Sequence, residues 1–405
     1  MTIGIKGIQR WRRLTEVLQG AVILGIPFLK IGGESALRFD IPSLKLHFFG
    51  VTLWMEEFFI VLVAVIFVTF LIVLITVVFG RIWCGWLCPQ TVIVDFTRFV
   101  DRASSKGFGY KLASLAATLA VSVIVAASLI WYFVSPYEFF GRLLSEDMGK
   151  IIWGFWIVLT GILFLNFVFL RHRFCATVCP YAKLQSVLYD NGTLVIAFDP
   201  ERREECMDCM ACVRVCPVGI DIRKGMSGAC INCAECIDKC TEMRAKVKKE
   251  SLINYSFGLP GEKRKIIRQN VVMISLITLA SFAFLLHLFF SRVAIDMTVL
   301  PNQGFLPRTS ADGTALNSYL LSFRNRSRAD LTVKIRAKGE RGEVSIIPDT
   351  ILLKAGEYRK IPVFVRMEGE ALKGGSGGVD ISVESRQDER VDTITKKVYF
   401  EVPHS

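Results

Sequence analysis

Several common functional signatures are missing from this 405-residue sequence, and each absence narrows what the protein can do. It has no C-x-x-C-H motif for covalent haem, no Walker phosphate loop and no G-x-G-x-x-G dinucleotide fingerprint. It also has no helix-turn-helix, RRM or zinc-finger pattern, so its formal net charge of +12 does not indicate nucleic-acid binding. We therefore expect neither nucleotide-driven chemistry nor a nucleic-acid partner.

Isolated cysteines are missing as well. The chain has twelve cysteines, each of them in a short-spaced cluster, and the last hundred residues contain none. A disulfide framework is typical of small secreted domains with scattered cysteines, so ligation of metal centres is the better interpretation. The twelve are Cys84, Cys88, Cys175, Cys179, Cys206, Cys209, Cys212, Cys216, Cys230, Cys233, Cys236 and Cys240.

Long uncharged apolar runs, in contrast, are abundant. Hydrophobic residues make up 52% of the chain, and its mean hydropathy of +0.44 indicates membrane spans. Four runs reach the roughly 20 residues that a spanning helix needs: Phe58–Gly80, Leu112–Val134, Ile151–Leu170 and Val271–Phe290. A shorter run, Val17–Leu29, follows a basic start. Because no small-x-small cleavage pattern follows it, we interpret it as an uncleaved first span rather than a signal peptide.

Lysine and arginine are distributed unevenly between the connections of these spans, and this bias predicts the orientation. With the N-terminus inside, two inner connections hold four and five basic residues, whereas the outer ones hold three and two. The segment 171–268, between spans four and five, holds seventeen. We therefore expect this segment in the cytoplasm, and the region after span five on the periplasmic side of a bacterial inner membrane.

From about Leu300 the pattern changes to alternating apolar and polar residues, which is typical of strands. Clusters of Gly, Asp and Lys separate these stretches, for example at 373–378. About a hundred residues of short strands predict an immunoglobulin-like sandwich, here without its usual disulfide. The strand-like stretches are Leu331–Ala337, Val344–Ile347, Ile361–Val365, Val379–Val383 and Thr395–Val402.

The segment between spans four and five contains the most specific pattern. It has two C-x2-C-x2-C-x3-C runs, the second repeating the first after 24 residues. In ferredoxins the first three cysteines of such a run hold one [4Fe–4S] cluster and the fourth holds the other. Zinc is the alternative, but it usually takes separated C-x2-C pairs or histidines, and no histidine lies among these eight cysteines. We predict one cluster on Cys206, Cys209, Cys212 and Cys240, and a second on Cys230, Cys233, Cys236 and Cys216.

Two C-x3-C-P pairs close predicted spans two and four. They are Cys84 and Cys88 in GRIWCGWLCPQT, and Cys175 and Cys179 in RHRFCATVCPYAK. Residues four apart on a helix share a face, and the proline would end the span or begin a new helix. Both pairs fall on the predicted cytoplasmic side, where four thiols could converge near the clusters as soft ligands for copper(I) or zinc.

The residues around these pairs are weaker signals. Arg81, Arg171 and Arg173 are expected to favour the thiolate form. Packing of small buried residues is the alternative interpretation of the cysteines, but the same unusual pattern at two equivalent span ends favours a metal or redox role. For Asn166 and His287, inside spans four and five, a helix-to-helix hydrogen bond is as good an explanation as a functional role.

Together these motifs resemble the FixG/RdxA/CcoG family, accessory proteins for the assembly of cbb3-type cytochrome c oxidase. The resemblance runs through FDIPSLKLHFFG at 39–50, both C-x3-C-P segments, the cluster region with CPVGIDIR, and ESLINYS at 250–256. It extends into DGTALNSYLLSFRN at 312–325, which is similar to the start of the family's immunoglobulin-like domain.

The resemblance implies a cupric reductase, in which electrons pass through two clusters to copper(II) and copper(I) is supplied to the oxidase. It implies a copper site on Cys84, Cys88, Cys175 and Cys179. It also implies oxidase assembly factors, or copper chaperones and a copper transporter, as partners besides membrane lipid. The sequence does not identify the cytoplasmic electron donor.

The predicted architecture is multi-domain: an α-helical membrane bundle of about five spans, an inserted dicluster ferredoxin-like α+β segment, and a C-terminal all-β immunoglobulin-like sandwich. Its parts are a membrane domain at 1–180, a cytoplasmic cluster domain at 181–268, a fifth span at 269–291 and a periplasmic domain at 300–405.

Two other functions stay open from the sequence. One is a membrane electron relay, similar to the ferredoxin-type subunits of periplasmic nitrate and nitrous-oxide reductase systems, which share paired C-x3-C-P and dicluster motifs. The β-rich C-terminal region argues against it. The other is a non-catalytic assembly scaffold with structural clusters.

Overall fold

The computed structural model describes residues 7–103, 106–258, 267–309, 314–327, 329–339, 344–367, 377–387 and 390–401. The chain divides into two compact units, Met1–His287 and Leu288–Ser405, and each is described by itself.

Four helices of the described residues are long and apolar enough to cross a bilayer, and they confirm the four longer predicted spans. They are α2 (Phe58–Phe79), α6 (Phe108–Ile130), α8 (Gly149–Leu165) with its π-helical continuation Asn166–Leu170, and α13 (Gln269–Phe290). In α2, α8 and α13 only 6% of the apolar window is buried inside the protein, so these surfaces require lipid to cover them. The chain is therefore a membrane protein.

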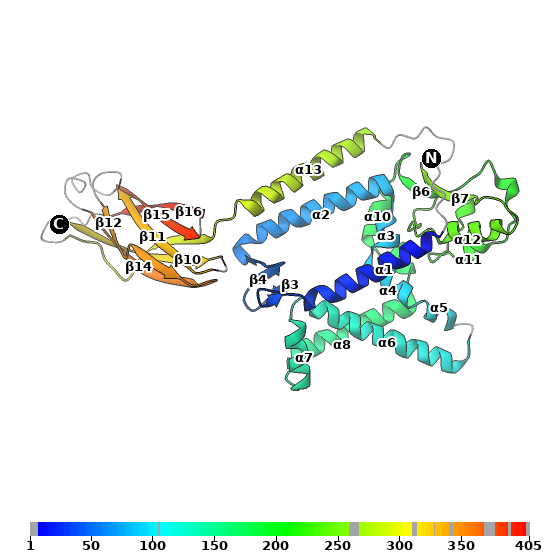
Figure 1. Cartoon of the computed structure of the whole chain (residues 1–405), viewed down its shortest axis with the longest axis horizontal. Coiled ribbons are helices and arrows are strands. Elements are labelled where there is room, and N and C mark those ends of the chain that lie inside the picture. Colours follow the sequence, from blue (N-terminus) through cyan, green and yellow to red (C-terminus); the bar gives the residue numbers. More distant parts are fainter. Residues whose placement is uncertain are drawn as a thin grey trace. The chain divides into compact units, whose positions relative to one another are not determined.

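These helices pack along one another in the first unit. Helices α2 and α13 lie side by side (Figure 1), with the rings of Phe67 and Phe282 5.1 Å apart. Asn166 accepts a hydrogen bond of 2.6 Å from Gln90, which agrees with the helix-to-helix interpretation of this residue. His287 is exposed at the end of α13.

Helix α1 (Ile8–Gly25) covers most of the predicted first span but is not among those four helices. Its first half is charged, and Arg12 and Glu16 are buried inside the protein. Its first backbone amides donate to Asp238 of the cluster segment, and its C-terminal turn accepts a hydrogen bond from Tyr132 after α6. The helix therefore runs alongside the membrane helices from one end to the other (Figure 1), and whether 17–29 spans the bilayer stays a prediction.

Short elements complete the first unit. A small antiparallel sheet, β3–β4–β5, and the hairpin β1–β2 lie between α1 and α2, and β6 pairs with β7 across the cluster segment. The helices are α3 (Ile82–Trp86), α4 (Pro89–Phe96), α5 (Phe99–Ala103), α7 (Pro136–Leu144), α9 (Arg173–Thr177), α10 (Pro180–Val187), α11 (Ala211–Arg214) and α12 (Glu235–Ala245), with 3-10 turns at Ile26–Phe28, Met55–Glu57, Arg203–Glu205 and Ile222–Lys224. The strands are β1 (Lys30–Ile31), β2 (Glu34–Ser35), β3 (Leu37–Asp40), β4 (Lys45–Phe48), β5 (Val51–Trp54), β6 (Leu194–Phe198) and β7 (Ile253–Phe257).

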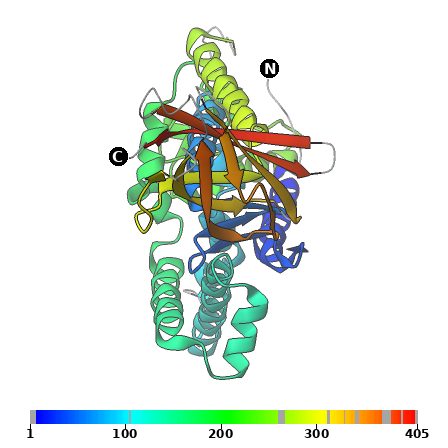
Figure 2. The same ribbon diagram turned by 90° about the vertical axis from the view of Figure 1, so that its left-hand side faces the viewer.

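The second unit is a sandwich of two antiparallel sheets, ordered β12–β14–β10–β8 with β9 beside β10, and β13–β11–β15–β16 (Figure 2). Its strands are β8 (Ile295–Pro301), β9 (Arg308–Thr309), β10 (Ala315–Asn325), β11 (Leu331–Gly339), β12 (Val344–Ile347), β13 (Thr350–Leu353), β14 (Tyr358–Met367), β15 (Gly377–Gln387) and β16 (Arg390–Phe400). Alternate residues of β11 point inward, as the sequence pattern predicted. Leu321, Phe323 and Val363 are fully buried in the core between the sheets, which therefore holds together without a disulfide.

The boundaries of this unit differ from the predicted ones. Strand β8 begins at Ile295 and pairs with β10, so the sandwich starts before the predicted residue 300. Strands β8, β9, β10 and β13 were not among the predicted stretches. Strands β11, β12, β14 and β15 contain the stretches predicted there, whereas β16 ends at Phe400, before the end of the predicted stretch Thr395–Val402. Most of the glycine-rich stretch at 373–378, and Val402, lie outside the described residues.

Candidate metal centres

The eight ferredoxin-type cysteines line two adjoining cavities. One cavity is lined by Cys206, Cys209, Cys212 and Cys240. The other is lined by Cys216, Cys230, Cys233 and Cys236, and Cys212 lines it as well. Each cavity thus includes a thiol from the opposite run, as crossed ligation requires.

The two runs have the same backbone, as a true repeat should. Asp208 and Asn232, 24 residues apart, both have positive φ, of 45° and 54°, and Met210 and Ala234 repeat this at 55° and 63°. Left-handed backbone is costly for residues other than glycine and tends to occur at functional sites. The thiols of Cys206 and Cys230 lie near the side-chain oxygens of Asp208 and Asn232, at 3.8 and 3.6 Å.

A small core supports both runs. Leu194 and Ile196 of β6, Ile237 of α12 and Leu252 before β7 pack together with Cys212. In the part of the chain that the structure describes, no three Cys, His, Asp or Glu side chains form a site for a single metal ion, and this includes the four C-x3-C-P thiols, which are not assembled as a single-ion site. Four thiolates around a [4Fe–4S] cube stand further apart than ligands of one ion, and the all-cysteine donor set of each cavity fits such a cluster.

The two C-x3-C-P motifs also share one local structure. Gly80 (φ 62°, ψ −143°) and Arg171 (φ 47°, ψ −133°) break the chain away from α2 and from the end of α8 in the same conformation. The first cysteine of each motif then lies in a one-turn helix, α3 or α9. The second caps the next helix, α4 or α10, with proline at the first helical position. The predicted new helix after proline is confirmed, but the two cysteines of a pair do not lie on one continuous helix.

These motifs bring their first cysteines together. Cys84 and Cys175 are both buried in one apolar cluster with Ile231 and Cys233 of the second cysteine run. The thiol of Cys84 donates to Gln185 of α10 at 3.0 Å. No sequence motif points to Gln185, since the contact joins residues about a hundred positions apart.

The thiol pKa values differ from expectation. Burial raises the pKa of Cys175 to about 11 and raises that of Cys84, and the nearby charge of Arg81 does not outweigh burial. Arg171 instead bonds to Asp101 and to backbone oxygens, and Arg173 is exposed. Arg81 thus favours the thiolate form of both cysteines, as predicted, but burial outweighs its charge and both thiols are protonated near neutral pH. A soft metal ion that binds them must displace protons.

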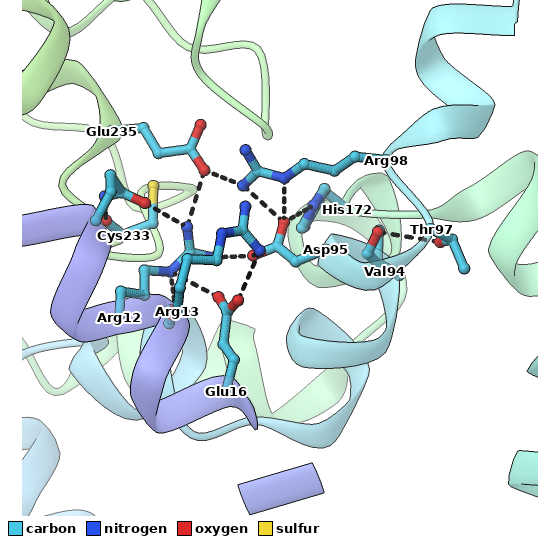
Figure 3. Close-up of polar contacts among 12 residues, drawn as sticks. Arg12, Arg13, Glu16, Val94, Asp95, Thr97, Arg98, His172, Cys233 and Glu235 are labelled. Atoms are coloured by element: carbon cyan, nitrogen blue, oxygen red, sulfur yellow. Dashed lines mark hydrogen bonds and ion pairs between the residues drawn. The ribbon is translucent and has the colours of Figure 1, made fainter. Parts of the chain in front are cut away.

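A buried ion network, which the sequence did not reveal, joins these sites (Figure 3). Asp95 of α4 lies between Arg12 of α1, Arg98 and His172, and Arg12 and Arg98 also reach Glu235 of α12. Burial alone would raise the pKa of Asp95. The hydrogen bond from His172 and the charges of Arg12 and Arg98 outweigh it and hold that pKa well below its usual range.

Family models match most of this chain. The model described as a 4Fe-4S dicluster domain matches residues 170–205 and 201–257, and a 4Fe-4S binding domain matches 60–107. Both C-x3-C-P pairs fall inside these matches. The model described as the IG-like fold at the C-terminal of FixG matches residues 285–403.

Three curated proteins illustrate the similarity. Protein RdxA of Cereibacter sphaeroides is 28% identical over 349 residues, covering 76% of this chain and 74% of that protein. Nitrogen fixation protein FixG of Rhizobium meliloti is 30% identical over 257 residues, covering 55% of this chain and 49% of that protein. Ferredoxin-type protein NapH of Escherichia coli is 27% identical over 189 residues, covering 42% and 64%.

Proposed function

Since the chain belongs to the FixG/RdxA-like family, with its 4Fe-4S dicluster domain and FixG-type immunoglobulin-like domain, we propose that this iron–sulfur electron-transfer protein reduces copper(II) to copper(I). The substrate would bind at Cys84, Cys88, Cys175 and Cys179. The observation that carries the proposal is the buried cluster of Cys84 and Cys175 against Cys233, because it puts the first thiol of each pair beside the second cysteine run.

The ligand assignment follows the two cavities. Cys206, Cys209, Cys212 and Cys240 would hold one [4Fe–4S] cluster, and Cys230, Cys233, Cys236 and Cys216 the other. Such clusters, when bound, supply one-electron transfer.

The chemistry at the thiol pairs follows from their softness and burial. Thiolates prefer copper(I) to copper(II), so their binding makes bound copper easier to reduce. Because burial raises the pKa of Cys84 and Cys175, copper binding would release their protons, and the Cys84 thiol would give up the hydrogen bond that it donates to Gln185. Each copper(II) would gain one electron from the cluster-binding segment, and a low-potential one-electron donor on the cytoplasmic side would return one electron to that segment.

In the cell, we propose that the protein acts in the inner membrane during assembly of a cbb3-type oxidase. Its product copper(I) would pass to assembly factors, copper chaperones or a copper transporter. The partial similarity to NapH favours a membrane electron relay as the second candidate. The relay needs no copper at the thiols, so copper binding by variants of these cysteines separates the two functions.

Iron analysis tests the cofactor assignment. We expect about eight iron and eight sulfide per chain in anaerobically purified protein, from two four-iron clusters. About twelve iron per chain would assign the C-x3-C-P thiols to a third cluster and contradict the copper proposal, and zinc in place of iron would contradict the two iron–sulfur clusters.

Crossed ligation is tested by the fourth cysteine of each run. Cys216→Ser should damage the cluster held by the later run, and Cys240→Ser the cluster held by the earlier run, as EPR of the reduced protein would resolve.

The orientation is tested by cysteine labelling. Ala355 lies in an exposed turn of the sandwich, and the sandwich contains no native cysteine. We expect Ala355→Cys to react with a membrane-impermeant thiol reagent in spheroplasts. Lys246→Cys, at the exposed end of α12, should add labelling only after lysis. The opposite pattern would mean that the predicted topology, based on Lys and Arg counts, is inverted.

A further inference from the structure

The second cysteine run, 230–240, fits closely against the first thiol motif. A Cβ atom added to Gly85, the residue after Cys84, would lie 2.2 Å from the carbonyl oxygen of Ile231 and 3.0 Å from the amide nitrogen of Cys233. In the second C-x3-C-P motif the equivalent residue is Ala176. The motif itself therefore accepts a side chain at this position, and it is the cysteine run that requires glycine at Gly85.

Asn232 anchors the same run to the end of α2 and to the β6–β7 pair. Its carbonyl oxygen accepts hydrogen bonds from Trp86 at 3.2 Å and from Tyr255 at 2.7 Å. Its side-chain amide donates to the carbonyl oxygens of Leu194 at 3.1 Å and Phe79 at 3.3 Å. These bonds leave the backbone around Cys233 little freedom to move away from the thiol motif.

Helix α1 holds both partners of this contact. The fully buried Arg12 donates through Nε to the carbonyl oxygen of Gly85 at 2.7 Å and through Nη1 to Glu235 at 2.8 Å (Figure 3). One turn earlier, Gln9 donates to the carbonyl oxygen of Cys233 at 2.7 Å. The helix thus bridges the residue after Cys84 and the residues around Cys233. The apolar cluster around Cys84 and Cys175 contains no cysteine of the first run among the described residues.

We infer that α1 clamps the second cysteine run onto the first C-x3-C-P motif, with Arg12 as the positioning residue, and that copper(II) would receive its electron from the cluster that Cys230, Cys233, Cys236 and Cys216 would hold. This inference rests on the proposed function. In each turnover one copper(II) becomes copper(I), the cluster domain loses one electron, and a low-potential donor, dithionite in the tests below, returns one electron. The cavity of Cys206, Cys209, Cys212 and Cys240 is then the entry side.

The contact at Gly85 provides the sharper test. In the full-length, cluster-loaded protein, Gly85→Ala should push the run around Ile231 away and lower kcat for copper(II) reduction about tenfold or more, with KM within about twofold. It should also shift the midpoint potential of the second cluster and not that of the first. Gly109→Ala, where no atom lies within 4 Å of the added methyl, is the matched control and should change neither.

The effect of bound copper(I) on the midpoint potentials of the two clusters provides an independent test. A copper(I) ion bound at the thiol pairs should raise the midpoint potential of the nearer cluster, because a positive charge favours its reduced, more negative form. We expect the second cluster to respond and the first to be unchanged, with Cys216→Ser and Cys240→Ser assigning the two signals. A shift confined to the first cluster would overturn the inference.

Three substitutions in α1 test Arg12: one removes its charge, one keeps it, and one removes the charge of an exposed arginine as the control. Arg12→Gln should lower kcat and shift the second potential, Arg12→Lys should restore part of both, and Arg10→Gln, at an exposed position of the same helix, should change neither. If Arg12→Gln fails to fold, Gly85→Ala alone tests the inference.

Parent-like midpoint potentials and a parent-like kcat in Gly85→Ala overturn the inference while leaving copper reduction intact. Absence of copper binding in the parent instead overturns the proposed function, and the potentials of Gly85→Ala without copper still test the clamp.

Discussion

Replacing Cys84 and Cys88 by serine, or Cys175 and Cys179 by serine, should abolish copper reduction while leaving the iron content close to that of the parent. These thiols lie outside both cysteine cavities, so their loss removes no proposed cluster ligand. A hydroxyl is a hard ligand and binds copper(I) poorly. Loss of second-shell contacts alone costs about 10–100-fold in metal affinity, so we expect loss of two ligands to exceed this. Copper(I) competition with a chromogenic chelator measures it.

The reciprocal variants serve as the control. Cys209→Ser or Cys233→Ser should lose about half of the iron and slow reduction, with copper(I) binding retained. Variants of Cys84, Cys88, Cys175 or Cys179 that reduce copper at the parent rate would identify these cysteines as packing residues. The membrane electron relay would then become the better account of the protein.

The cluster segment could be predicted from the spacing of its cysteines, because each ligand loop is formed by residues close together in the sequence. Each run is a tight loop, and the 24-residue offset predicts two loops of one shape, which the paired positive φ angles of Asp208 and Asn232 confirm. The membrane helices were equally predictable, since about 20 apolar residues leave few alternatives. The sandwich strands were predicted where alternation is regular, as in β11, and missed in β10, where both faces are largely buried.

The remaining features depend on contacts that no local pattern encodes. Arg12 was counted among the basic residues of an inner connection, yet it is fully buried. Its acidic partners, Asp95 and Glu235, lie 83 and 223 positions away in the sequence, so no local pattern shows that they meet. The protonation of Cys84 and Cys175 was hidden for the same reason. The neighbouring arginines are visible in the sequence, and Arg81 does lower both pKa values, but the burial that outweighs its charge is not visible. Gly85 looks like any other glycine until the cysteine run packs against it.

The ion network should also determine whether the membrane helices and the cluster segment stay assembled, and Asp95→Asn tests this. The asparagine keeps the shape of the aspartate but removes the negative charge that compensates Arg12 and Arg98 and that accepts the hydrogen bond from His172. Breaking a buried ion pair by removing one partner costs about 3–5 kcal/mol. We expect a clearly lowered thermal transition of the detergent-solubilised protein, together with loss of iron from the cluster segment.

Asp101→Asn is the matched control for this variant. Asp101 is also an aspartate close to α4 and pairs with Arg171 at 2.8 Å, but its side chain is 57% exposed. The side chain of Arg171 is 11% exposed and keeps its bonds to backbone oxygens, so only the solvated carboxylate is lost. Such a pair contributes about 0–1 kcal/mol, and Asp101→Asn should melt close to the parent. Equal effects of the two substitutions would contradict a special role for the buried network.

The pH dependence gives a further check on Asp95. Because its folded pKa lies well below that of the unfolded chain, its contribution is fully present above the unfolded value, roughly pH 4, and is lost as the pH falls through the folded pKa. Between pH 5 and pH 8 Asp95 is ionised in both states, but Glu16, whose pKa is raised to about 7 by burial and by the charge of Asp95, titrates in the folded protein in this range. Because Asp95→Asn removes that charge and lowers the pKa of Glu16, the difference in melting temperature between parent and Asp95→Asn should be larger at pH 5 than at pH 8. A difference that shrinks as the pH falls from 8 to 5 would mean that Asp95 takes up a proton in that range, and that the two arginines do not hold it as an ion.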